Sequence, residues 1–193
     1  MGLDYLEIAL QVGATLEKLG ATWHLGGSLA SSMHGFPRAT LDADLVANLQ
    51  PGQGEAFCRL LGAGFYADKN AIDEAIQARS SFNVIHLKTM FKVDVFVLKD
   101  TAFDRESFFR SQAETLGESG SQVRVATPED TVLHKLLWYE KGDELSHRQW
   151  ADLVGVLKVQ GHKLDLDYLH RWARDLGLVD SLHRALKEAG VAP

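Results

Sequence analysis

The chain has 193 residues, of which 46% are hydrophobic and 24% charged, as expected for one globular domain or for one domain with a helical extension. Its 26 acidic residues outnumber its 20 basic residues, and the resulting net charge of −6 argues against broad, non-specific binding to nucleic acids or membrane surfaces. Cys58 is the only cysteine, which excludes an internal disulfide and a cysteine-based zinc cluster.

The N-terminal sequence carries acids early and lacks a basic region followed by an apolar core, so it predicts no secretory signal. No apolar run approaches the length that spans a membrane. We therefore expect a cytoplasmic protein with no membrane partner.

The first part of the chain predicts a helix, a short strand and a glycine-rich turn. Apolar residues at helical spacing predict a helix over residues 3–19, and residues 21–25 predict a strand. Residues 26–28, Gly-Gly-Ser, then lead into a helix over residues 29–34. A glycine pair allows close approach of a ligand, and a helix start presents free N–H groups to an anion. Taken alone, however, these residues favour an ordinary tight turn in which Ser28 caps the helix.

Two aspartates interrupt the apolar strand that the sequence predicts over residues 41–48. Because side chains alternate along a strand, Asp42 and Asp44 point to the same face. Neighbouring carboxylates repel each other, and desolvation adds to that cost. A divalent cation would reverse the penalty, since Mg²⁺ prefers carboxylate oxygens. The pair therefore predicts a metal site.

A third acid occupies the centre of a later apolar strand. Residues 81–87 and 91–98 predict a β-hairpin, and within the second strand Asp94 shares a face with Lys92 and Phe96. The alternative to a site residue is a surface aspartate on an edge strand. The repetition of this unusual placement favours the site.

The rest of the sequence predicts a mixed α/β core over residues 1–126 and a C-terminal helical subdomain over residues 127–193 that packs on the core. Thr127 and the following Pro-Glu-Asp form a strong helix start. The remaining predicted elements are helices over 51–62, 72–79, 104–113, 128–140, 146–159, 166–176 and 178–189, a turn over 117–120 and a strand over 122–126.

Of three further charged residues, two have two interpretations each. Arg38 either faces a phosphate or is a solvated loop residue, and its nearness to the aspartate pair favours the phosphate. Lys135 lies off the apolar stripe of its helix, so it is either solvated or directed at a site beyond the stripe. Asp152 likewise lies away from the core-facing side of its helix.

The Gly-Gly-Ser turn, the Asp-x-Asp pair and the third aspartate together resemble the nucleotidyltransferase superfamily, which has the DNA polymerase β-like fold. The fuller strings GGSLASSMHGFPRATLDADL, FKVDVFVL and ATPEDTVLHKLLW are similar to AbiEii-type nucleotidyltransferase toxins and their small relatives. This resemblance covers roughly residues 20–155. It implies a mixed sheet flanked by helices, with a C-terminal helical extension.

The resemblance implies a role for each of the unusual residues. Asp42 and Asp44 would ligate two Mg²⁺ ions, and Asp94 would complete the metal site and help to deprotonate the acceptor. Lys135 would contact phosphate, and Asp152 would orient that lysine or the base. The nucleotide-binding set is then Gly26, Gly27, Ser28, Arg38, Lys135 and Asp152.

The activity that the resemblance implies is transfer of a nucleoside monophosphate from a nucleoside triphosphate (NTP) to a hydroxyl or phosphate acceptor, with release of pyrophosphate. A toxin-like role makes the acceptor an RNA, with tRNA first, and an antitoxin protein a possible partner. The alternatives are a catalytically silent module that binds a nucleotide or a partner, and an antibiotic-modifying enzyme of the aminoglycoside nucleotidyltransferase type.

Overall fold

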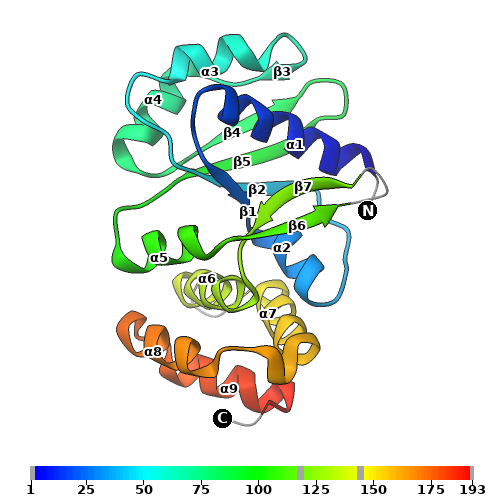
Figure 1. Cartoon of the computed structure of the whole chain (residues 1–193), viewed down its shortest axis with the longest axis vertical. Helices are drawn as coiled ribbons and strands as arrows, with labels where there is room; N and C mark the ends of the chain where they lie inside the picture. The colour runs from blue at the N-terminus through cyan, green and yellow to red at the C-terminus, as the bar shows by residue number, and fades with distance from the viewer. Residues whose placement is uncertain (1–2, 117–119, 143–145, 192–193) are drawn as a thin grey trace. The chain divides into compact units, whose positions relative to one another are not determined.

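Figure 1 shows the computed structural model of the chain, which describes residues 3–116, 120–142 and 146–191. The described chain forms two compact units. The sheet unit comprises the residues up to Gly26 together with Ala39–Val125, and the helical unit comprises Gly27–Arg38 together with the residues from Ala126 onward. The helical unit is therefore assembled from two separate stretches of sequence, whereas the sequence predicted a single division at residue 126.

The sheet unit is organised around a mixed sheet whose described strands follow the order β3-β4-β5-β2-β1-β7-β6. β2 pairs with β5 and β1 with β7 in parallel, and the other neighbours are antiparallel. This arrangement confirms the predicted α/β class with a mixed sheet. The strands are β1 (Trp23–Leu25), β2 (Asp42–Ala47), β3 (Phe65–Tyr66), β4 (Ser81–His86), β5 (Phe91–Val97), β6 (Gln112–Leu116) and β7 (Ser121–Val125).

The two faces of the central strands differ, because side chains alternate along them. In both β2 and β5, fully buried apolar residues alternate with half-buried ones, and the aspartates are among the half-buried. Helices α1 and α4 pack against the sheet, and α3 packs against both of these helices (Figure 1). The described helices of this unit are α1 (Leu3–Lys18), α3 (Gly54–Leu61), α4 (Lys69–Ala78) and α5 (Ala102–Arg110).

In the helical unit, α2 packs against α6 and α7, and α7 also packs against α9. Thr127 caps α6 as predicted: its hydroxyl accepts a hydrogen bond from the Asp130 N–H and donates one to the Asp130 carboxylate. The described helices are α2 (Gly27–His34), α6 (Pro128–Lys141), α7 (His147–Gln160), α8 (Leu166–Leu176) and α9 (Val179–Ala189), with a 3₁₀ turn over Gly161–Lys163.

Gly35 lets the end of α2 approach α7 closely. A Cβ at this position would lie 2.8 Å from the backbone nitrogen of Val156 and 2.9 Å from the carbonyl carbon of Gly155. Both are backbone atoms that cannot rotate away, so the packing of these two helices requires glycine here.

Four local predictions differ from the structure or lie outside it. The helix predicted over 104–113 ends at Arg110, because residues 112–116 pair with β7 as strand β6, and tertiary pairing overrides local propensity. In the helix predicted over 51–62, the apolar spacing of Phe57, Leu60 and Leu61 predicts that all three face inward, but Leu60 is 39% exposed. Ser28 does not cap α2, since the helix already begins at Gly27. The predicted turn at 117–120 falls mainly on residues outside the described ranges.

Among the described residues, every helix is either too short or too polar to cross a membrane.

Candidate functional site

The three aspartates singled out in the sequence lie on interior strands of the sheet. β2, which carries Asp42 and Asp44, runs between β5 and β1, and β5, which carries Asp94, runs between β4 and β2. An edge strand could turn an acid to solvent at little cost, but neither strand is at an edge. The explanation of Asp94 as a surface residue on an edge strand is therefore wrong. The interior position of the three acids requires a different explanation.

The parallel register of β2 and β5 brings the acids together on one face. Asp44 lies opposite Asp94, and Asp42 lies opposite Lys92. Neighbouring strands are about 4.8 Å apart, so each pair lies side by side across the strands. All four side chains are half-buried. We call this set of four residues the acidic face.

Asp94 and Asp42 of the acidic face each have a close polar partner within the sheet unit. The Lys92 ammonium lies 2.7 Å from Oδ2 of Asp94. The hydroxyl of Thr40 donates hydrogen bonds to the side chain of Asp42, at 2.8 Å, and to its backbone carbonyl, at 3.1 Å. The hydrogen bond to Asp94 raises the pKa of Lys92 against the opposing effect of desolvation, and the charges of all three aspartates raise it further.

The acidic face fits a divalent cation in the chemistry of its donors and in their register. Carboxylate oxygens are the ligands that Mg²⁺ prefers, and the three acids share one face of adjacent strands. Among the described residues, however, no three His, Cys, Asp or Glu side chains gather closely enough to hold a metal ion. Lys92 and Thr40 engage two of the three carboxylates instead.

The glycine pair follows β1 directly. The N–H of Gly26 donates a 2.9 Å hydrogen bond to the carbonyl of Asp44, which continues the antiparallel pairing of β1 with β2. Gly27 has a φ of 51°, in the left-handed region that favours glycine, and it begins α2. The sharp change of direction after β1 therefore explains the second glycine without any ligand.

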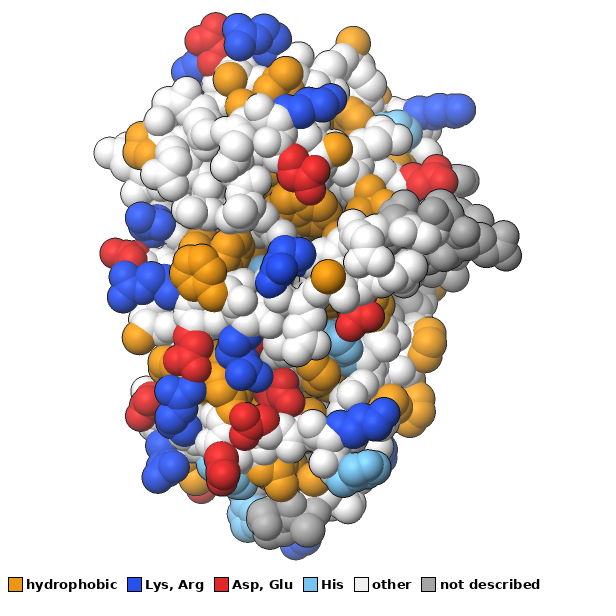
Figure 2. All heavy atoms as spheres, in the orientation of Figure 1, with side chains coloured by type: hydrophobic (Ala, Val, Ile, Leu, Met, Phe, Trp, Pro, Cys, Tyr) orange, Lys and Arg blue, Asp and Glu red, His pale blue; other side chains and the backbone are white. Residues whose placement is uncertain are grey.

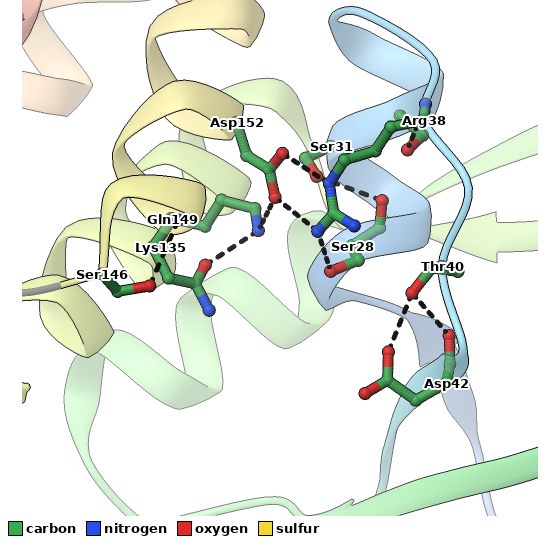
Figure 3. Close-up of polar contacts among 10 residues, drawn as sticks. Ser28, Ser31, Arg38, Thr40, Asp42, Lys135, Ser146, Gln149 and Asp152 are labelled. Carbon is green, nitrogen blue, oxygen red and sulfur yellow. Dashed lines mark hydrogen bonds and ion pairs between the residues drawn. The ribbon is translucent and has the colours of Figure 1, made fainter.

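In the helical unit, Asp152 of α7 accepts hydrogen bonds from two cations. Its carboxylate takes a forked pair from Arg38, at 2.8 Å from Nε and 2.9 Å from Nη2, and a third bond from Lys135 Nζ at 2.8 Å. Arg38 Nη2 also donates to the Ser28 hydroxyl at 2.7 Å, and Lys135 Nζ to Oε1 of Gln149 at 2.9 Å. Figure 3 shows these side chains, which we call the basic cluster.

At the centre of the basic cluster, two buried side chains of opposite charge pair with each other. The side chains of Lys135 and Asp152 are only 4% and 7% exposed. Desolvation alone would raise the pKa of Asp152, but the hydrogen bonds and charges of Arg38 and Lys135 outweigh it and hold that pKa below its usual range. The interpretation of Lys135 as a solvated lysine is thus wrong, and Arg38 is anchored to a buried carboxylate.

The structure therefore brings together the sequence-predicted residues in two groups, each within its own unit. Asp42, Asp44 and Asp94 share the acidic face, with Gly26 beside Asp44. The basic cluster links the predicted residues Ser28, Arg38, Lys135 and Asp152.

Sequence reasoning missed two polar neighbours of these groups. Gln149 precedes Asp152 by three positions, one helical turn, and this spacing was a signal that placed it on the same side of the helix. Asn83 lies opposite Asp94 across the antiparallel β4–β5 pair, and the register of the predicted hairpin could have located it.

No protein-family model matches this sequence, and no curated protein matches it significantly. Solved structures do share its fold. The enzyme ANT(2'')-Ia in complex with adenylyl-2''-tobramycin has a TM-score of 0.54 at 13% identity, over 88% of this chain and 98% of that one. An antigenic nucleotidyltransferase-like protein from Paracoccidioides brasiliensis has a TM-score of 0.53 at 15% identity, over 95% and 92%.

The lincosamide antibiotic adenylyltransferase LnuA, solved with lincomycin bound, has a TM-score of 0.50 at 12% identity, over 82% of this chain and 98% of that one. At these identities the likeness concerns the fold alone. The chain has the fold of nucleotidyltransferases, which confirms the predicted fold, whereas the names of the three structures do not include an AbiEii-type toxin.

Proposed function

We propose that this protein is a metal-dependent nucleotidyltransferase that transfers a nucleoside monophosphate from an NTP to a hydroxyl or phosphate acceptor. The observation that carries the proposal is the acidic face, where Asp44 lies opposite Asp94 on interior strands, with Asp42 two residues along. Three carboxylates at such positions lower the stability of the fold unless they bind a cation. The fold that the chain shares with adenylyltransferases supports the same chemistry.

We assign the metal to Asp42, Asp44 and Asp94, with two Mg²⁺ ions as the expected complement. These three carboxylates would hold such ions, which would supply Lewis-acid chemistry by neutralising the charge of the phosphates. The acceptor oxygen then forms a bond to the α-phosphorus, the bond from that phosphorus to the bridging oxygen breaks, and pyrophosphate leaves. The carboxylate of Asp94 accepts the proton that an acceptor hydroxyl loses.

We assign the phosphates of the nucleotide to Gly26, Gly27, Ser28, Arg38 and Lys135. In the basic cluster, Arg38 and Lys135 both donate to Asp152, which holds two cations close together, and cations so placed attract an anion. Asp152 then positions both cations rather than touching the substrate. Arg38 is the side chain best suited to the phosphates, since its planar guanidinium can bond Asp152 and an oxygen anion at once.

For the acceptor we propose an RNA end, with tRNA first, and an antitoxin as the corresponding partner, on the strength of the resemblance to AbiEii-type proteins. A second candidate is a small antibiotic, because two of the neighbours in fold carry names or ligands of antibiotic adenylylation. Figure 2 bears on this choice: basic and acidic side chains are interspersed over the face that it shows, rather than gathered into a basic surface.

The test is pyrophosphate release with each of the four NTPs and Mg²⁺, alone and with total tRNA, tobramycin or lincomycin. We expect turnover with one acceptor class in the wild type and its loss in the double variant Asp42→Asn/Asp44→Asn. The control is Asp175→Ala, which removes an exposed acid on α8. If the wild type binds NTP and metal but shows no turnover under any condition, the result would instead support a silent binding module. If the wild type binds neither NTP nor metal, the result would refute the site.

A further inference from the structure

Lys92 stands within the acidic face and occupies the place where a cation is expected. It precedes Asp94 by two residues on β5 and so projects to the same side, and the register of the sheet puts it directly opposite Asp42. Its ammonium lies 2.7 Å from Asp94 Oδ2. One lysine thus contacts one of the three acids and neighbours the other two.

This ion pair differs from an ordinary surface pair in the number of acids around it. An exposed lysine and a single carboxylate contribute little to stability. Here the Asp94 side chain is only 14% exposed, and Asp42 and Asp44 add their attraction for the same ammonium. Lys92 therefore offsets part of the repulsion among the three carboxylates.

A divalent cation and the Lys92 ammonium compete for the same oxygens. A metal ion bonded to Asp94 would lie about 2.1 Å from a carboxylate oxygen, within a few ångströms of the ammonium in its present position. Two cations so close repel each other strongly at the edge of a protein. One of them must leave, and Lys92 has the means to do so, since its side chain is 42% exposed and has a flexible four-carbon stem.

We propose that Lys92 is a tethered competitor of the metal: its ammonium holds the acidic face together in the metal-free protein and must leave Asp94 before a divalent cation binds. Lys92 thereby lowers metal affinity and makes the metal-free state tolerable. This inference rests on the proposed function, because it takes Asp42, Asp44 and Asp94 as the metal ligands.

The test compares Mn²⁺ binding, measured by electron paramagnetic resonance without nucleotide, in the wild type and in Lys92→Met, which keeps an apolar stem and loses the charge. We expect Lys92→Met to bind Mn²⁺ at least about tenfold more tightly. We also expect its metal-free form to melt at a lower temperature and to gain more from Mn²⁺ than the wild type gains. If Lys92→Met does not fold, Lys92→Gln carries the same expectation.

The matched control is Lys88→Met, the same change at an exposed lysine in the turn between β4 and β5, which should bind Mn²⁺ like the wild type. Equal or weaker Mn²⁺ binding by Lys92→Met would overturn the role of Lys92 and leave the proposed function standing. Failure of every form to bind Mn²⁺ would overturn the metal site itself, and the role of Lys92 with it.

Discussion

The acidic face and the basic cluster solve the problem of partly buried charge in opposite ways. In the basic cluster one deeply buried carboxylate, Asp152, is saturated by hydrogen bonds from two cations. On the acidic face three carboxylates lie on adjacent strands, and Lys92 pairs with one of them, Asp94. The first arrangement stabilises its unit. The second concentrates like charges on one face, and such a concentration persists where it serves a function at some cost in stability.

The largest effect should come from breaking the basic cluster. We expect Asp152→Ala to lower the free energy of unfolding by about 3–5 kcal/mol, because it strands the buried ammonium of Lys135 without its counter-ion. Urea unfolding followed by circular dichroism measures this. In the control Asp175→Ala the change should stay within about 0.5 kcal/mol. A loss of under about 1 kcal/mol in Asp152→Ala would contradict the structural importance of the cluster.

Substitutions at two glycines distinguish an effect on packing from an effect on nucleotide binding. Gly35→Ala should cost about 1–3 kcal/mol, because its Cβ would meet the backbone of α7. At Gly26 the nearest atoms to a new Cβ are Val46 Cγ2 at 3.8 Å and Asp44 O at 4.0 Å, which is ordinary contact. Gly26→Ala should therefore keep its stability.

Competition with a fluorescent NTP analogue measures nucleotide binding by Gly26→Ala. We expect Gly26→Ala to weaken nucleotide binding while its unfolding curve overlays that of the wild type. Unchanged nucleotide binding would remove Gly26 from the proposed site and leave only its part in the turn.

Removing an acid from the acidic face should change the stability of the protein in the opposite direction to the loss of Asp152. Without metal we expect Asp44→Asn to stabilise the protein by up to about 1 kcal/mol, since it relieves repulsion from Asp94. In Mg²⁺ the wild type should gain thermal stability and the variant should not. Differential scanning calorimetry with and without Mg²⁺ gives both results, and a destabilised metal-free variant would show that the acids are structural.

The smallest effect concerns pH. Because the pKa of Asp152 is held below its usual range, the stability that it contributes is complete above its unfolded pKa of about 3.9 and is lost as the pH falls through the lower folded value. The difference in unfolding free energy between the wild type and Asp152→Asn should therefore be constant from pH 7 to about pH 5 and shrink below about pH 4. A difference that grows in acid would reverse the assigned sign.

The sequence predicted well those features that depend on residues close together in the chain. The alternation of Asp42 and Asp44 fixed their common face, and the Thr-Pro-Glu-Asp start of α6 located its cap. Strand register was beyond it: the resemblance grouped Asp94 with Asp42 and Asp44, but nothing in the sequence places Asp44 directly opposite Asp94, since register depends on packing of the whole sheet. For the same reason the sequence left Lys135 between two interpretations, because its partner Asp152 sits on another helix.

The split composition of the helical unit has a consequence for how the protein is made. Helix α2 ends at His34, whereas α6 and α7, against which it packs, begin only at Pro128 and His147. During synthesis the α2 segment must stay unpaired until the sheet unit has been translated. Splitting the gene at residue 126 would strand α2 on the wrong fragment, along with Arg38 and Ser28. The C-terminal fragment would keep the Lys135–Asp152 pair and should regain the bonds from Arg38 to Asp152 only by reassociation.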